Sequence, residues 1–221
     1  MNNRFAKKLS ILMFAVLATV PVVQGMNEDK PAAKRRRGIM NSYLLLEAAA
    51  EGDLRLVHTL LRKGAHTHAT NLCGSTPLHL AARSGRIEVV RALLRGGARS
   101  DVRDNRGRLP LHLSVVLGHG AVTGLLLMHN SLVVDAKDND NNTALRLACI
   151  YHPAIVRLLM TAGADAEAPV LLHRNRTYLQ EVACEYDICS LGAVRALLTG
   201  GASMSESSYG FRWFTTSRLR P

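Results

Sequence analysis

The most constraining feature of this chain is a pattern in residues 74–98 that returns at a spacing of about 33 residues. The stretch reads GSTPLHLAARSGRIEVVRALLRGGA. A shift of one period brings Pro110 and His112 under Pro77 and His79, and weaker copies precede and follow. Repetition at this length is typical of a stacked array, in which each unit is sheltered by its neighbours rather than by one central core.

Each copy of the pattern predicts two antiparallel helices. Thr76 is a good N-cap, and Pro77 suits the first helical position, where its missing N–H costs nothing. Gly85 ends this helix because glycine adopts a left-handed backbone without strain. Apolar residues at helical spacing predict a second helix from Glu88 to Gly96. The unit is therefore helix, tight turn, helix and loop, and the predicted fold class is all-α.

The Thr-Pro-Leu-His start, the paired alanines and the closing Gly-Ala resemble ankyrin repeats. This resemblance implies a solenoid of about five helix-turn-helix units with projecting loops, over residues 41–204. The expected repeats are approximately 41–70, 71–103, 104–137, 138–170 and 171–204. The structural motif comprises Thr76, Pro77, Leu78, His79, Gly85, Pro110, His112 and Thr143. The resemblance also implies that His79 and His112 tie one loop to the next by hydrogen bonds.

Repeat 3 departs from the pattern and is expected to be the weakest unit. Leu109 stands where the capping threonine should be, and Gly124 lies inside the second helix. A glycine in a helix costs about 1 kcal/mol relative to alanine. A missing cap typically costs about another 1 kcal/mol.

The positive charge of the chain lies mainly outside the repeats. The net charge is +11, yet residues 41–204 carry 17 basic and 14 acidic side chains. Nucleic acid is therefore not an expected partner of the array itself. Binding of nucleic acid or anionic surfaces through the basic ends remains the alternative function, and it should weaken steeply with salt.

Residues 1–25 have the layout of a secretory signal peptide, with basic residues before a short apolar run. The expected localisation is secreted or periplasmic, with the membrane met only transiently; an uncleaved membrane anchor is the alternative. Residues 26–40 are interpreted as a basic linker. The basic tract in it could address the chain to the nucleus of a host cell, and consists of Lys30, Lys34, Arg35, Arg36 and Arg37. In this layout the chain resembles ankyrin-bearing effectors of intracellular bacteria.

Binding to a protein partner is the predicted function, since no catalytic motif or phosphate-binding glycine loop occurs in the chain. The expected contact surface is the loops and the concave face of the first helices. The candidate partner-binding residues are Arg99, Arg103, Arg106, Arg108, His66, His68, Asn71, Lys137, Asp138 and Asn139. First-helix residues Arg83, Ser84 and Arg146 are second choices. The alternative interpretation of the arginine cluster is a solvated loop with local ion pairs.

No enzyme activity, cofactor or metal is predicted, and the chain is expected to be a monomer that binds a protein not identified by its sequence. His66 and His68 lack further ligands in view. Residues 205–221 form a basic and aromatic tail, whose aromatic side chains could cap the last repeat or dock on a membrane or partner.

Overall fold

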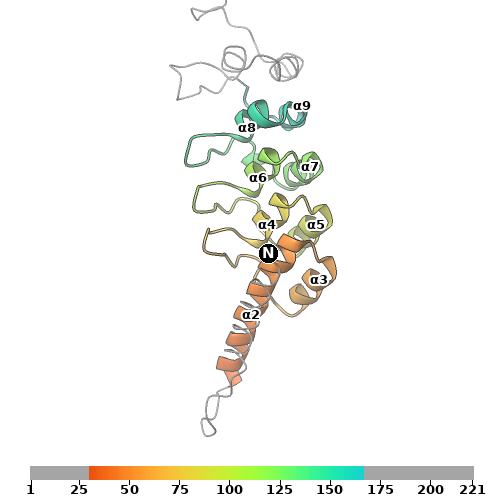
Figure 1. Ribbon diagram of the computed structural model, residues 1–221, viewed down its shortest axis with the longest axis vertical. Coiled ribbons are helices and arrows are strands. Elements are labelled where there is room, and N and C mark those ends of the chain that lie inside the picture. Colours follow the sequence, from red (N-terminus) through yellow and green to blue (C-terminus); the bar gives the residue numbers. More distant parts are fainter. Residues whose placement is uncertain (1–29, 167–221) are drawn as a thin grey trace, which may run out of the picture. The chain divides into compact units, whose positions relative to one another are not determined.

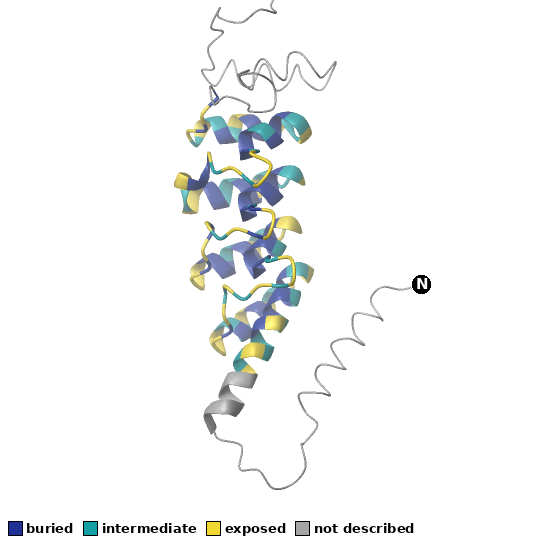
Figure 2. Ribbon diagram, turned by 90° about the vertical axis from the view of Figure 1, so that its left-hand side faces the viewer, coloured by how far each residue is buried: buried dark blue, intermediate teal, exposed yellow. Residues whose placement is uncertain are grey.

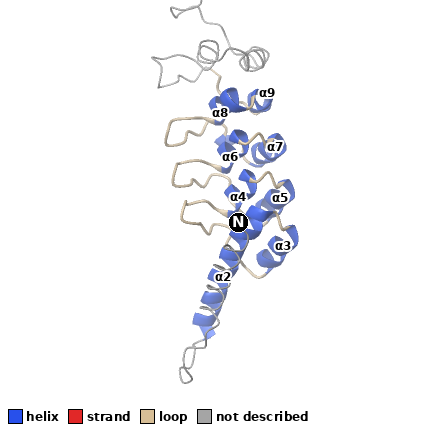
Figure 3. Ribbon diagram, viewed as in Figure 1, coloured by secondary structure: helices blue, strands red, loops and turns tan. Residues whose placement is uncertain are grey.

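The computed structural model describes residues 30–166, which contain helices and no strand (Figures 1 and 3). The all-α repeat fold is thus confirmed for this part of the chain. The helices are α2 (Lys30–Glu51), α3 (Leu54–Arg62), α4 (Pro77–Arg83), α5 (Ile87–Arg95), α6 (Pro110–Val116), α7 (Gly120–His129), a 3-10 turn η1 (Ser131–Val133), α8 (Ala144–Tyr151) and α9 (Pro153–Thr161). The expected signal peptide, fifth repeat and C-terminal tail lie outside the described residues.

The helices from Gly38 onward form four successive antiparallel pairs within the described residues. The first helices α4, α6 and α8 pack on one another in one row, and the second helices α3, α5, α7 and α9 form a second row (Figure 1). The loops between pairs project from the side of the first helices. We call them loop 1 (65–76), loop 2 (98–109) and loop 3 (134–143).

Helix α2 begins earlier than the sequence predicted. The segment expected to be a linker, residues 26–40, is helical from Lys30. The division between two compact units of the chain falls after Arg37, so the part of α2 from Gly38 onward belongs to the repeat array.

The ends of the helices follow the local signals in the sequence. α4 begins at Pro77, and the Thr76 hydroxyl accepts a hydrogen bond from the His79 backbone N–H at 3.4 Å. Gly85 has φ +66°, which only glycine adopts readily, and it separates α4 from α5. The expected second helix is α5, which ends before Gly96.

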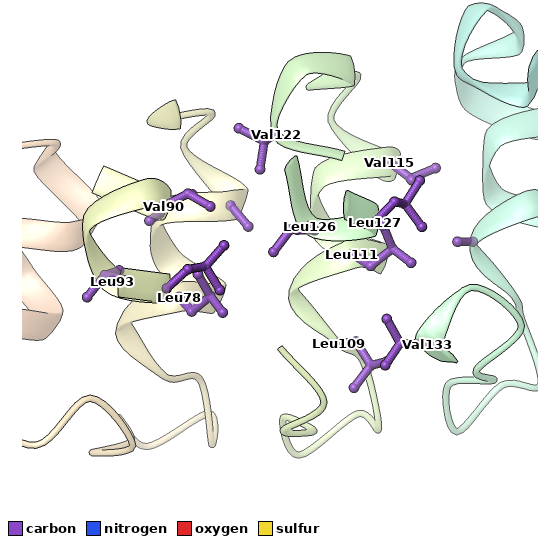
Figure 4. Packing of buried hydrophobic residues seen from close by; sticks show 14 of the residues in the cluster. Leu78, Val90, Leu93, Leu109, Leu111, Val115, Val122, Leu126, Leu127 and Val133 are labelled. Carbon is purple, nitrogen blue, oxygen red and sulfur yellow. The ribbon is translucent and has the colours of Figure 1, made fainter. Parts of the chain in front are cut away.

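The core is a continuous layer of small apolar side chains between the two rows and between neighbouring pairs (Figures 2 and 4). Leu78, Leu111 and Leu145 occupy equivalent positions on the first helices and are at most 1% exposed. Ala81 and Ala82 are fully buried, and their small side chains let adjacent helices approach closely. Each buried leucine stabilises the array by about 1.5–3 kcal/mol relative to an exposed one.

Repeat 3 keeps its helices despite its departures from the pattern. α7 runs through Gly124 without a break. Leu109 cannot cap α6 with an oxygen, but its side chain is only 2% exposed and its N–H still donates to His112 Nδ1 at 3.1 Å. Burial of an apolar side chain therefore offsets part of the missing cap.

Candidate protein-binding surface

Loops 1, 2 and 3 share one turn geometry, which is set by a single side chain in each loop. The Oδ1 atoms of Asn71, Asp104 and Asp138 each accept two backbone N–H groups, from the residues two and four positions later, at 2.8–3.0 Å. In each loop, the backbone N–H of the same residue also donates to the carbonyl of the residue four positions later, and this hydrogen bond closes the turn. Short polar side chains are suited to this because they replace a backbone partner in a turn.

Neighbouring loops are joined by a ladder of asparagines. The Asn105 side-chain amide donates to the Leu72 carbonyl at 3.0 Å, and its backbone N–H donates to the Cys73 carbonyl at 3.0 Å. Asn139 repeats both bonds one unit further along, to the carbonyls of Asn105 (3.2 Å) and Arg106 (3.0 Å). The three loop tips are therefore fixed relative to one another.

Two buried histidines fix the bases of loops 2 and 3. His79 Nδ1 accepts the Thr76 N–H at 3.2 Å, so Nε2 carries the proton and donates to the Arg108 carbonyl at 3.0 Å. His112 makes the equivalent bond to the Ala136 carbonyl at 3.0 Å. Burial lowers the pKa of both imidazoles below 6.5, which keeps them neutral. These contacts have the form that the ankyrin resemblance implied.

The four arginines of loop 2 do not act as one charged patch. Arg99 pairs with Asp101 through two hydrogen bonds of 2.8 and 2.9 Å. Arg103 donates to the carbonyls of Gly107 and Lys137. Arg108 donates twice to Asp104 Oδ2, at 2.8 and 3.0 Å. Within residues 37–166, the guanidinium of Arg106 has no hydrogen-bond or ionic partner, and the residue is exposed.

The two carboxylates in this cluster are held ionised. Burial alone raises the pKa of Asp104, but the Arg108 guanidinium and the backbone N–H groups of Arg108 and Arg106 outweigh it and lower that pKa. The hydrogen bond from Arg99 lowers the pKa of Asp101. Asp104 and Arg108 thus form part of the loop framework, whereas Arg99 and Asp101 form an exposed pair of little energetic consequence.

The other predicted site residues fall into two groups. Asn71, Asp138 and Asn139 hold the loops together, as described above. His66, His68 and Lys137 are exposed, and His68 Nδ1 lies 3.1 Å from the neighbouring Thr67 hydroxyl. Over the described part of the chain, no group of three or more histidine, cysteine or acidic side chains is placed to hold a metal ion.

The second-choice residues lie on the first helices. Arg83 and Ser84 are exposed at the end of α4. Arg146, on α8, is half-buried, and its guanidinium donates to Asn142 Oδ1 at 2.6 Å.

Sequence reasoning missed the apolar members of this surface. Leu72, at the tip of loop 1, is 100% exposed. Leu117 and Tyr151, at the ends of α6 and α8, are 44% and 55% exposed at positions equivalent to Ser84. Alignment of the repeats would have revealed Leu72, because Asn105 and Asn139 occupy its place in the next two loops.

A second pair of linking histidines was also missed. His119 and His152 precede the second helices of repeats 3 and 4, and their Nε2 atoms lie 3.1 Å from the carbonyls of Arg83 and Val116 in the preceding repeat. Their rings lie over Gly85 and Gly118, where a Cβ atom would approach within 2.7 Å. The signal was their recurrence at equivalent positions of adjacent repeats.

No helix in residues 30–166 combines the length and the apolar character that crossing a membrane requires.

Comparison with known proteins identifies the repeats. No curated protein matches the chain significantly. Residues 45–138 match the family model for ankyrin repeats in three copies. The matched residues span repeats 1 to 3, with the helix pairs and projecting loops described above. Residues 45–138 of the chain are therefore ankyrin repeats.

Proposed function

We propose that this chain is a monomeric protein-interaction scaffold that holds its partner on the tips of loops 1 to 3 and on the exposed ends of the first helices. Ankyrin repeats generally mediate contacts between proteins, and proteins built from them are typically not enzymes. The proposal for this surface is more specific and depends on how its side chains are used.

The observation that carries the proposal is an exposed leucine on a rigid support. The side chain of Leu72 is 100% exposed, while its carbonyl is fixed by the Asn105 amide at 3.0 Å. A rigid apolar anchor loses little conformational entropy on binding, and buried anchors of this kind dominate protein interfaces. Leu72 is therefore the expected centre of the contact.

The charge beside this anchor indicates the chemistry of the partner. Arg106, on the next loop, has a guanidinium without a partner in residues 37–166, whereas Arg103 and Arg108 are engaged within the loop framework. A partner surface with an apolar pocket beside a carboxylate would satisfy both Leu72 and Arg106.

The test compares two double variants of the full chain. Leu72→Ser with Arg106→Glu removes the anchor and reverses the charge. Leu56→Ser with Arg62→Glu removes an exposed leucine and reverses one charge on α3, away from the loops. Affinity capture from a eukaryotic cell lysate, quantified by mass spectrometry, should lose specific proteins with the first variant and keep them with the second. Equal capture by both variants, with unchanged circular dichroism, would rule out the loop surface.

We also propose that residues 1–25 direct export of the chain, and that residues 30–37 can direct it to a host nucleus afterwards. Support comes from the order of basic and apolar residues at the start of the sequence. N-terminal sequencing of chain recovered from the periplasm or medium should begin close to Met26. The nuclear signal is tested by expressing residues 26–221, with and without residues 30–37, in eukaryotic cells and measuring the amount of each chain in the nuclear fraction. Equal nuclear amounts of the two chains would exclude the signal.

A further inference from the structure

Helices α5 and α7 lie side by side in the row of helices away from the loop tips (Figure 1). A groove is lined by residues of both helices. It consists of two hollows of about 360 and 330 Å³ that share Leu94 and His129. The first is lined by Arg91, Leu94, Arg95, Leu125, Met128 and His129. The second continues past Gly97 to Asp101 at the start of loop 2.

The lining of this groove is apolar on one side and cationic on the other. Met128 is 88% exposed and Leu125 is half-buried, so α7 contributes apolar surface that no described residue covers. Methionine is flexible and polarisable, which suits it to packing around an incoming side chain. Arg91 and Arg95 lie one turn apart on α5, at the edge of the same hollow.

The positive charge along this row of helices is largely uncompensated. Helices α3, α5, α7 and α9 contain five arginines and one acidic residue, Glu88. Glu88 contacts Arg91 at 3.5 Å, with both side chains substantially exposed, so the pair is weak. Within the described residues, Arg95 has no acidic partner.

We propose that the groove between α5 and α7 binds an acidic amphipathic helix of a partner protein. An apolar side chain of that helix enters the hollow beside Leu94, Leu125 and Met128. Two carboxylates spaced by four residues face Arg91 and Arg95, because residues four apart lie about 6 Å apart on both helices. This surface is separate from the loop tips.

Charge and shape decide against other occupants of the groove. The C-terminal tail, residues 205–221, has three arginines and one glutamate, so it would be repelled by Arg91 and Arg95. A membrane surface is flat and would leave a hollow of about 360 Å³ unfilled. A helix with one protruding apolar side chain fills the hollow and neutralises its edge.

The probe is a displayed library of random peptides about 16 residues long, selected on the full chain and counter-selected on Arg91→Glu/Arg95→Glu. We expect enrichment of peptides with Asp or Glu four residues apart and Leu, Phe or Met between them. A synthetic peptide of the enriched sequence should bind the wild-type chain in fluorescence anisotropy. Its affinity should fall at least about tenfold with Arg91→Glu/Arg95→Glu and with Met128→Glu.

Two control variants test whether peptide binding depends on this groove rather than on the overall charge of the chain or on the loop surface. Arg55→Glu/Arg62→Glu makes the same charge change on α3, which lines neither of the two hollows, and should leave the affinity within about twofold. Leu72→Ser/Arg106→Glu should also leave it unchanged, so this inference can fail independently of the proposed function. The peptide with lysines in place of its acidic residues should bind Arg91→Glu/Arg95→Glu better than the wild-type chain.

Three results would overturn the proposal. The first is a failure of the charge signature, seen either as a selection without acidic enrichment or as binding equally sensitive to the α3 variant. The second is binding of phosphatidylserine vesicles through Arg91 and Arg95 without peptide binding, which would assign the face to a membrane. The third is a dimer in analytical ultracentrifugation that Arg91→Glu/Arg95→Glu dissolves, which would assign it to a second copy of the chain.

Discussion

Replacement of Gly124 by alanine should stabilise the array, although the glycine faces the following repeat. Gly124 lies inside α7, where alanine is favoured over glycine by about 1 kcal/mol. A Cβ atom built at this position lies 3.8 and 3.9 Å from the two methyl carbons of Leu158 on α9, which is ordinary van der Waals contact. The new methyl group therefore adds contact between repeats 3 and 4 without strain.

The expected gain is about 1 kcal/mol in the free energy of unfolding, from helix propensity alone. Urea denaturation followed by circular dichroism at 222 nm measures it, as a higher midpoint with an unchanged slope. Gly85→Ala is the matched control, because Gly85 has φ +66° and its Cβ would lie 2.7 Å from the His119 ring. That variant should lose stability by more than the first gains.

The reasoning would be refuted if Gly124→Ala proved neutral or destabilising while its circular dichroism spectrum stayed that of the wild type. Such a result would mean that α7 must bend or slide against α9 at this glycine. Equal effects of the two substitutions would contradict the distinction between a right-handed helical glycine and a left-handed one.

Four further predictions concern the contacts that stabilise the repeats and their loops. Burial lowers the pKa of His79 and His112, so the unfolded chain binds protons first as pH falls; the free energy of unfolding should be constant above about pH 6.5 and decrease below it, less steeply with His79→Gln. Asn105→Ala removes one loop-to-loop hydrogen bond, which should cost about 1 kcal/mol and speed hydrogen exchange in loop 1. Leu111→Ala leaves a cavity in the central layer and should cost about 2–5 kcal/mol in urea denaturation. Arg108→Glu places a second carboxylate beside one that is 1% exposed and should cost about 2 kcal/mol or more, whereas an exposed loop substitution such as Arg106→Glu should stay within about 0.5 kcal/mol.

The fold could be predicted because its signals are local and repeated. Helix ends are predicted by the capping and backbone preferences of Thr76, Pro77 and Gly85. Because the pattern recurs every 33 residues or so, the same helix ends can be predicted in the copies that match it less well. The helical start of α2 was not predicted, because the basic tract has no apolar periodicity, although Asp29 and Pro31 are residues that favour a helix start. A linker and a solvated helix have the same sequence pattern there.

The candidate site was less predictable because charge in a sequence does not reveal how it is used. Four arginines in one loop predict a basic patch, but three of them bond to the loop itself. Which arginine stays outward depends on the turn that Asp104 forms with the N–H groups of Arg106 and Arg108. In that turn the Arg108 side chain bonds to Asp104, whereas the Arg106 side chain lies exposed at the tip of the loop.

Comparison of equivalent positions separates residues that hold the array from those available for binding. A residue needed by a neighbouring repeat recurs, as Asn105 and Asn139 do, because each one reaches back to the loop before it. Leu72 occupies the same position in loop 1, where the described residues contain no preceding loop, so stacking does not require an amide there. Without the need for a hydrogen bond to a preceding loop, a polar side chain would suit this exposed position, yet it holds a fully exposed leucine. Exposure of an apolar side chain brings no gain in folding free energy, and the proposed function supplies a benefit, because a partner that buries Leu72 would gain affinity from it.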